Sequence, residues 1–168
     1  RIPGFFKSVN PLWPPYLLRD TFRNSQMNSI PYRWPRPDPI IMDIGSGEVA
    51  AEQPYIHRVS RMAVAAAHAG RGFEFVRRAS HKIWSGEVDN WHEGNHLADA
   101  AAEAGLDAGA LEATVRDRGE ELAAEIAQNE ADQRNAGHWG VPLFVFQDEP
   151  FFGQDRLDHL IWRMKQAG

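Results

Sequence analysis

The sequence predicts a mixed α/β domain with a block of helices inserted into it. Three stretches of the 168 residues lead to this class. Residues 1–53 are rich in proline and aromatic residues, residues 54–136 are rich in alanine and leucine, and residues 137–168 change to short apolar runs typical of strands. Because a hairpin and a helix follow the helical block, we expect the first and last stretches to form one domain around an inserted bundle.

The first 53 residues leave room for one helix. Eight of the eleven prolines lie before residue 40, and each proline restricts both its own backbone and that of the preceding residue. The window between them is residues 16–28, and Pro14 and Pro15 suit the start of a helix. Residues 34–43 should form an extended loop.

The middle stretch has the apolar spacing of consecutive helices. Apolar residues recur at three- and four-residue steps, and glycines follow several of the repeats. The pattern predicts a helical bundle formed by residues 54–70, 72–85, 90–104 and 108–135.

The last thirty residues predict a β-hairpin followed by a helix. Residues 141–146 form an apolar run with β-branched and aromatic side chains, residues 147–150 suit a turn, and a second strand begins at residue 151. Asp155 could cap a terminal helix that begins after it and runs through Lys165, because its carboxylate can accept a hydrogen bond from the first turn.

Composition excludes several classes of partner. The chain has 18 Lys and Arg residues against 23 Asp and Glu residues, so its net charge of −5 gives no electrostatic reason to bind nucleic acid or an anionic membrane. Cysteine is absent, so these residues form no disulfide and supply no thiol nucleophile. We therefore expect a cytoplasmic protein with neither nucleic acid nor a membrane as its partner, and we keep a homodimer as an alternative to a monomer.

One motif matches a zinc site by letter. The string His-Glu-Gly-Asn-His at residues 92–96 fits the pattern that supplies two zinc ligands and a general base in metalloproteases. Gly94 and Asn95 are poor helix formers, however, and the motif requires both histidines on one helical face. We favour a helix-start role for this segment and expect no metal site, with a zinc hydrolase as the alternative.

Several motifs together resemble a known family. Gly-Val-Pro at residues 140–142 precedes a strand, and Phe-Gly-Gln-Asp-Arg-Leu follows the hairpin at residues 152–157. Upstream lie Ala-Glu-Ala-Gly-Leu-Asp at residues 102–107 and an aromatic helix at residues 73–86. This pattern resembles the branch of the thioredoxin-like superfamily that contains 2-hydroxychromene-2-carboxylate isomerases, kappa-class glutathione transferases and DsbA-like proteins. The resemblance implies a thioredoxin-like fold, with residues 1–53 and 137–168 forming that domain and residues 54–136 an inserted α-helical bundle.

The resemblance also implies a glutathione site. In thioredoxin-like folds the proline that Pro142 resembles usually follows a cis peptide bond. The backbone of Val141 would then pair with the cysteinyl part of glutathione like an added strand. The family pattern places Gln154 and Asp155 on the γ-glutamyl end, and Asn10 and Lys7 in a loop that contacts the tripeptide. We further place Trp13 and Trp139 near the substrate, because they flank these two loops. The alternative is that Pro142 only shapes a turn, Asp155 only caps its helix and Lys7 is a solvated charge.

The resemblance places the catalytic residue upstream of Arg1. In this family a serine, or a cysteine of a C-x-x-C motif, lies between the first strand and the first helix, and we expect that unit to precede the sequence. A serine predicts a glutathione-dependent isomerase or transferase acting on an aromatic-derived carboxylate. A cysteine predicts a DsbA-like thiol–disulfide oxidoreductase. A binding protein without catalysis is the third possibility, since one fold serves several functions.

Overall fold

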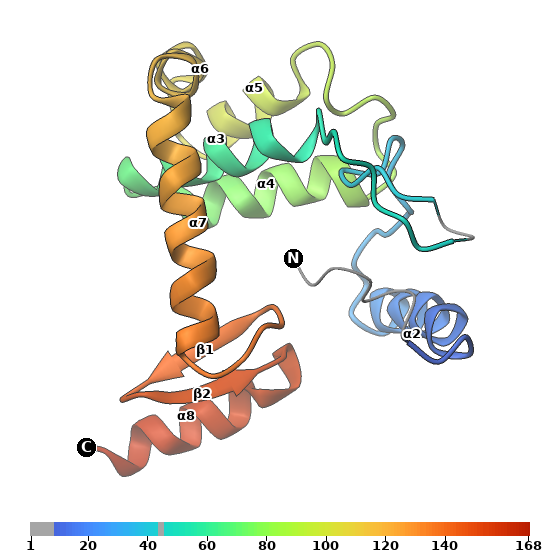
Figure 1. Cartoon of the computed structure of the whole chain (residues 1–168), viewed down its shortest axis with the longest axis vertical. Helices are drawn as coiled ribbons and strands as arrows, with labels where there is room; N and C mark the ends of the chain where they lie inside the picture. The colour runs from blue at the N-terminus through green and yellow to red at the C-terminus, as the bar shows by residue number, and fades with distance from the viewer. Residues whose placement is uncertain (1–8, 44–45) are drawn as a thin grey trace. The chain divides into compact units, whose positions relative to one another are not determined.

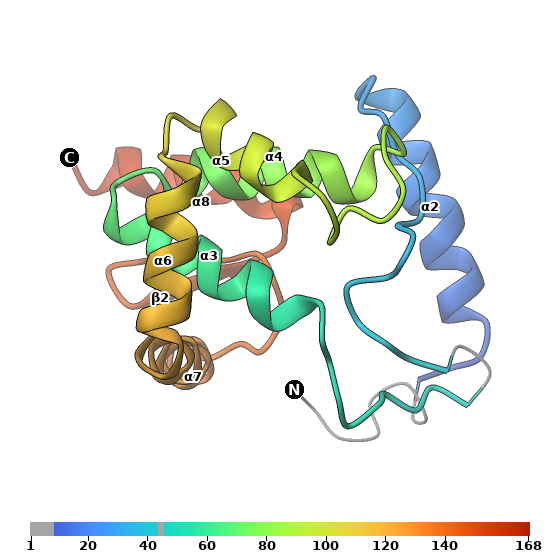
Figure 2. The ribbon, with the colours of Figure 1, turned by 90° about the horizontal axis from the view of Figure 1, so that it is seen from above.

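A computed structural model describes residues 9–43 and 46–168 of the chain. The chain divides into two compact units, Arg1–Leu122 (unit 1) and Ala123–Gly168 (unit 2). Figures 1 and 2 trace the chain through both units. The division into domains at residues 53/54 and 136/137 that the sequence suggests stays a prediction.

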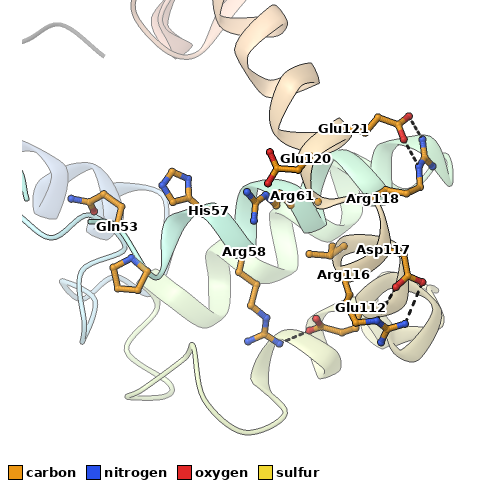
Figure 3. A pocket seen from close by; sticks show the side chains of 13 residues that line it. Gln53, His57, Arg58, Arg61, Glu112, Arg116, Asp117, Arg118, Glu120 and Glu121 are labelled. Atoms are coloured by element: carbon orange, nitrogen blue, oxygen red, sulfur yellow. Dashed lines mark hydrogen bonds and ion pairs between the residues drawn. The ribbon is translucent and has the colours of Figure 1, made fainter. Parts of the chain in front are cut away.

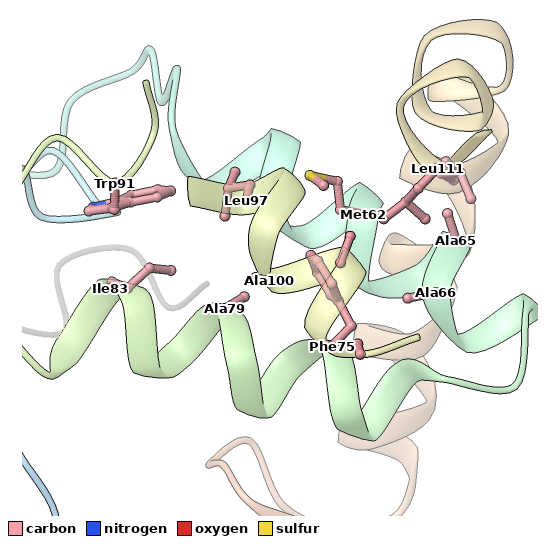
Figure 4. Packing of buried hydrophobic residues seen from close by; sticks show 13 residues of the cluster. Met62, Ala65, Ala66, Phe75, Ala79, Ile83, Trp91, Leu97, Ala100 and Leu111 are labelled. Atoms are coloured by element: carbon pink, nitrogen blue, oxygen red, sulfur yellow. The ribbon is translucent and has the colours of Figure 1, made fainter. Parts of the chain in front are cut away.

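Unit 1 contains helices that enclose one hydrophobic core. Helix α3 (Ile56–His68) packs against α4 (Gly72–Trp84) and α6 (Ala108–Asp117), and α5 (His96–Glu103) packs against both α4 and α6. Figure 4 shows the side chains that meet between these helices. The largest fully buried side chains are Met62, Phe75, Trp91, Leu97 and Leu122. The predicted bundle is confirmed, and α3 and α4 lie within a few residues of their expected bounds.

Alanines at the helix contacts explain how these helices approach one another closely. Ala65 and Ala66 of α3, Ala79 of α4, and Ala100 and Ala101 of α5 are all buried in the core. Small side chains shorten the distance between packed helices, so the larger Met and Phe side chains can fill the remaining space at high density.

The helix expected over residues 90–104 is shorter than predicted. Helix α5 begins only at His96, and residues 90–95 form turns. Two hydrogen bonds explain the difference: the Asn90 amide donates to the Arg36 carbonyl at 2.7 Å, and the Trp91 indole donates to the Pro37 carbonyl at 2.8 Å. Contacts with the proline-rich loop therefore replace the first turns of the predicted helix.

The single long helix expected over residues 108–135 is in fact two helices. Helix α6 ends at Asp117, Arg118 leaves the helical conformation, and α7 (Gly119–Asn135) begins at the next residue. The break lets Leu111 of α6 and Leu122 of α7 enter the same core. Glycine favours such an interruption because it is a poor residue for a helix interior.

Helix α2 (Trp13–Met27) starts three residues before the predicted window, with Pro14 and Pro15 in its first turn as expected. None of its residues is buried. The loop over residues 34–43 contains no helix, which confirms the prediction. Residues 1–8, 44 and 45 are not described.

Unit 2 contains the β-hairpin predicted from the sequence. Strand β1 (Leu143–Phe146) pairs antiparallel with β2 (Glu149–Phe152), with Leu143 opposite Phe152. The turn is Gln147 and Asp148, whose φ angles of 49° and 64° are those of a two-residue turn with both central residues left-handed. Pro150 belongs to β2 and not to the turn, so the sequence prediction placed the second strand two residues too late.

The terminal helix α8 (Leu157–Gln166) packs against both strands (Figure 1). Arg163 of α8 forms an ion pair with Glu149 of β2 and donates a hydrogen bond to its carboxylate at 3.1 Å. Residues 154–156 form a short 3₁₀ turn (η1, Gln154–Arg156) and not the first turn of the α-helix. The α-helix therefore begins one residue later than a cap at Asp155 predicts.

The sheet is smaller than the mixed α/β class suggests. Within residues 9–43 and 46–168, strand pairing is confined to β1 with β2 and to an isolated bridge between Met42 and Val49. The described part of the chain is thus mostly helical. Among the described residues, no helix combines the length and the apolarity that crossing a membrane requires.

Candidate functional site

The loop between α7 and β1 carries the peptide groups that the sequence singled out. The Val141–Pro142 peptide bond is cis, as the resemblance implied. The Pro142 carbonyl accepts a hydrogen bond from the Gly153 amide at 2.9 Å, which places this loop beside the residue that follows β2. Pro142 and the Gln154–Arg156 turn are therefore neighbours at one end of the hairpin.

Val141 is a largely exposed residue whose backbone groups have no partner in the described part of the chain. Its residue surface is 78% exposed. Neither its amide nor its carbonyl makes a hydrogen bond to any residue within 9–43 and 46–168. An exposed N–H and C=O on one residue next to a strand can pair with an extended peptide, as in strand addition.

Both backbone groups of the preceding residue, Gly140, are occupied by side chains. The Gly140 amide donates to His138 Nδ1 at 2.9 Å, and the Gly140 carbonyl accepts from Gln133 Nε2 at 2.7 Å. Gln133 lies on α7, so this second bond ties the loop to the helix before it. Gly140 itself is buried.

Aromatic rings pack around Gly140. The His138 ring stacks on Phe152, with centroids 4.0 Å apart and planes at 20°, and lies 5.5 Å from the Trp139 ring. A Cβ atom at position 140 would overlap the Phe152 ring and lie 2.9 Å from His138 Cε1. Only glycine fits here. Trp139, predicted to lie near the substrate, thus stands in the same ring cluster.

Gln154 and Asp155 lie in the short 3₁₀ turn after Gly153. The Asp155 carboxylate accepts a hydrogen bond from Arg156 Nη1 at 2.9 Å and is largely exposed. The predicted capping role of Asp155 is wrong: α8 has no side-chain cap, and its first residue is two positions further on. The Asp155 carboxylate consequently remains open to solvent on one side.

Asn10 and Trp13 belong to unit 1. The Asn10 side chain accepts a hydrogen bond from the Leu12 amide at 2.9 Å, and the Asn10 backbone carbonyl accepts one from the Trp13 amide at 2.8 Å. Asn10 therefore shapes the start of α2. Trp13 is partly exposed. Lys7 lies outside the described residues. Of the predicted contacts, unit 2 brings together Val141, Pro142, Gln154, Asp155 and Trp139.

A groove of about 560 Å³ runs along the same part of unit 2. It lies between α7 and β1, and Gln133 and Val141 are both on its wall. Its apolar lining consists of Ile126, Ala136, Val141, Leu143 and Val145. The groove gives the exposed Val141 backbone an apolar neighbourhood.

The histidine pair at residues 92–96 does not form the helical motif of a zinc protease. His96 is the first residue of α5, and His92 lies in the turn before it. The His92 ring contacts the Tyr55 ring, with centroids 4.4 Å apart. The backbone carbonyl of His92 accepts a hydrogen bond from the Arg58 side chain at 3.1 Å. In the described ranges no three His, Cys, Asp or Glu side chains gather as a metal site.

Unit 1 contains a larger, charged cavity of about 750 Å³ between α3 and the α6–α7 junction (Figure 3). Its guanidinium and carboxylate groups largely pair with each other: Arg58 with Glu112, Arg116 with Asp117, and Arg118 with Glu121. Hydrogen bonding from Arg118 lowers the pKa of the Glu121 carboxyl. Because most of its charges are already paired, this cavity offers a ligand few free groups.

Comparison with known proteins identifies the class. Residues 16–165 match the family of the DSBA-like thioredoxin domain, and the chain belongs to this family.

Two relatives make the likeness more specific. A 2-hydroxychromene-2-carboxylate isomerase of Sphingobium xenophagum is 38% identical over 86 residues, which are 51% of this chain and 43% of that protein. The chain thus spans less than half of this curated relative. A solved structure of a 2-hydroxychromene-2-carboxylate isomerase superposes with a TM-score of 0.64 at 18% identity, covering 96% of this chain and 73% of that one. This structural likeness shows a shared fold, and the sequence resemblance to this branch is confirmed.

Sequence reasoning did not single out His138 and Gln133. His138 stands two residues before Gly140, the spacing at which a side-chain acceptor can reach a backbone amide, so a local signal was present. Gln133 is seven residues away on another element, and its contact depends on how α7 meets the loop. Spacing alone contains no signal for that contact.

Proposed function

We propose that this chain carries the glutathione-binding part of a glutathione-dependent isomerase or transferase that acts on an aromatic-derived carboxylate. Family membership and the likeness to 2-hydroxychromene-2-carboxylate isomerases support the class of enzyme. The observation that carries the glutathione site is the backbone of the exposed residue Val141, whose N–H and C=O have no partner among the described residues.

The residues of unit 2 fit the chemical groups of this tripeptide. Glutathione is an extended peptide, so its cysteinyl N–H and C=O can pair with the two free groups of Val141. Its γ-glutamyl end carries an ammonium group, for which the exposed carboxylate of Asp155 is a suitable acceptor, with Gln154 beside it. When bound, glutathione would supply the thiolate that adds reversibly to the unsaturated substrate.

The chain's own contribution in this scheme is binding and orientation. Val141 would hold the cysteinyl residue in one register, and Asp155 would hold the distant end of the tripeptide. Two separated contacts restrict the thiol to a small region, which is how positioning accelerates a reaction between two molecules. Trp139, exposed in the ring cluster beside Val141, is the proposed contact for the aromatic part of the substrate.

Titration calorimetry of the full chain with reduced glutathione tests this proposal. We expect saturable binding that Asp155→Ala weakens by about 5- to 10-fold, because a hydrogen bond to a charged group is lost. Asp158→Ala is the matched control, since Asp158 is an exposed carboxylate in the first turn of α8 and should leave binding unchanged. Absence of binding at millimolar glutathione, or equal effects of the two variants, would contradict the proposal.

A further inference from the structure

Two successive peptide planes before Val141 are each held by a side chain. His138 Nδ1 accepts from the Gly140 amide at 2.9 Å, which holds the plane between residues 139 and 140. Gln133 Nε2 donates to the Gly140 carbonyl at 2.7 Å, which holds the plane between residues 140 and 141. The second plane is the one that also contains the amide of Val141.

The Gly140 carbonyl and the Val141 amide belong to the same planar peptide group, so the hydrogen bond from Gln133 also fixes the direction of the Val141 N–H. The bond between residues 140 and 141 is not among the cis bonds of the chain, so its C=O and N–H point in opposite directions. When the Gln133 amide group holds the Gly140 oxygen toward α7, the Val141 N–H is directed away from that contact. Rotation of this peptide plane would break the bond to Gln133.

We propose that Gln133 is a positioning residue for the thiol peptide: by holding the Gly140 carbonyl, it directs the Val141 amide toward the bound glutathione. The inference rests on the proposed function. It extends the site beyond its contact residues to α7, and it assigns Gln133 a role in affinity that does not require the side chain to touch the ligand.

His138 supports the same arrangement from the other side of Gly140. Because Nδ1 accepts a hydrogen bond, the neutral ring carries its proton on Nε2. The stack on Phe152 holds this ring in place, so the imidazole acts as a fixed acceptor for the Gly140 amide. Asparagine can accept from the amide two residues later in the same way, which provides a conservative replacement.

The test compares two glutamines on the same helix. Gln133→Met removes the hydrogen-bond donor and keeps the length of the side chain. Methionine also favours the helical conformation about as much as glutamine does. Gln128→Met is the matched control, because Gln128 is exposed on α7 and, among the described residues, its side chain bonds only to Asp132, at 2.8 Å. For both variants, we would measure glutathione affinity by calorimetry and the unfolding midpoint of the full chain.

We expect Gln133→Met to weaken glutathione binding about 3- to 10-fold, the effect of losing one hydrogen bond, while Gln128→Met leaves it unchanged. Gln133→Lys, which retains a donor, should recover most of the affinity. Equal affinity in wild type and Gln133→Met would overturn the inference, as would equal losses in the Met and Lys variants. Failure of the wild type to bind glutathione would overturn the proposed function itself.

Amide hydrogen exchange supplies a readout that a purely structural role would not change. In the wild type, glutathione should slow exchange at the Val141 amide at least tenfold, and in a folded Gln133→Met variant saturated with glutathione this protection should shrink. His138→Asn should retain the protection and His138→Phe should lose part of it, because only asparagine keeps the acceptor. Unaltered protection in Gln133→Met would contradict the positioning role even if this variant is less stable.

Discussion

The two units of the chain bury their apolar side chains to very different degrees. In unit 1, Met62, Phe75 and Leu122 are fully buried within one cluster. In unit 2, all of whose residues are described, Phe151 is the one buried hydrophobic side chain, whereas Val141 and Trp162 are mostly exposed. The bundle thus has its own core, and the hairpin unit relies more on hydrogen bonds and turn geometry.

This difference separates stability from binding. Burial of large apolar side chains is the dominant favourable contribution to folding, so unit 1 should provide most of the free energy of unfolding. Unit 2 exposes apolar surface and unpaired backbone groups, which are the features that a peptide or aromatic ligand can use. Variants in the two units should therefore affect different measurements.

The largest effect is expected in the bundle core. Phe75→Ala should lower the free energy of unfolding by about 3 to 5 kcal/mol, because it removes a ring that is 0% exposed and leaves a cavity. Phe73→Ala on the same helix should change it by less than about 0.5 kcal/mol, because Phe73 is 79% exposed. Urea unfolding followed by circular dichroism measures both. Similar losses in the two variants would show that the bundle core is not the main source of stability.

A smaller and more local effect is expected in the loop of unit 2. Gly140→Ala places a methyl group against the Phe152 ring, and overpacking of this kind costs about 1 to 3 kcal/mol. Amide exchange should therefore accelerate in β1 and β2 while α3 and α4 keep their protection. Gly119→Ala is the control for the hairpin, since a Cβ there lies at ordinary contact distance from Arg61 in unit 1 and should leave exchange in β1 and β2 unchanged. Uniform acceleration across both units would contradict the expected confinement of the effect to unit 2.

The smallest effect concerns the hairpin turn. Gln147 adopts a φ of 49°, a region that asparagine tolerates better than glutamine. Gln147→Asn should therefore stabilise the hairpin by about 0.5 kcal/mol, seen as slower amide exchange at Phe146 and Glu149. The same replacement at Gln128, inside α7, should give no gain, because asparagine is the weaker helix former. A gain at both positions would point to a cause other than turn geometry.

Much of the fold and part of the site followed from local patterns. The prolines, the small-residue helices and the hairpin run predicted most elements within a few residues. The family resemblance carried by the Gly-Val-Pro motif pointed to Val141 and Pro142 as candidate site residues, and their role in binding stays a prediction. Local patterns failed where distant partners intervene. Asn90 and Trp91 form hydrogen bonds to the proline-rich loop and therefore lie outside the helix that the sequence predicted for them. Asp155 lies in a 3₁₀ turn, and its carboxylate meets Arg156 instead of capping α8.

The sequence by itself determined the helical block, the hairpin and the membership in a family, because apolar period, turn residues and short motifs act over a few neighbouring positions. Only the tertiary structure decided which peptide groups are occupied and which are free. Gln133 and His138 occupy both backbone groups of Gly140, whereas the N–H and C=O of Val141 have no partner in residues 9–43 and 46–168. Hydrogen-bond partners are selected by distances in space, and those distances arise only when helix, loop and hairpin come together.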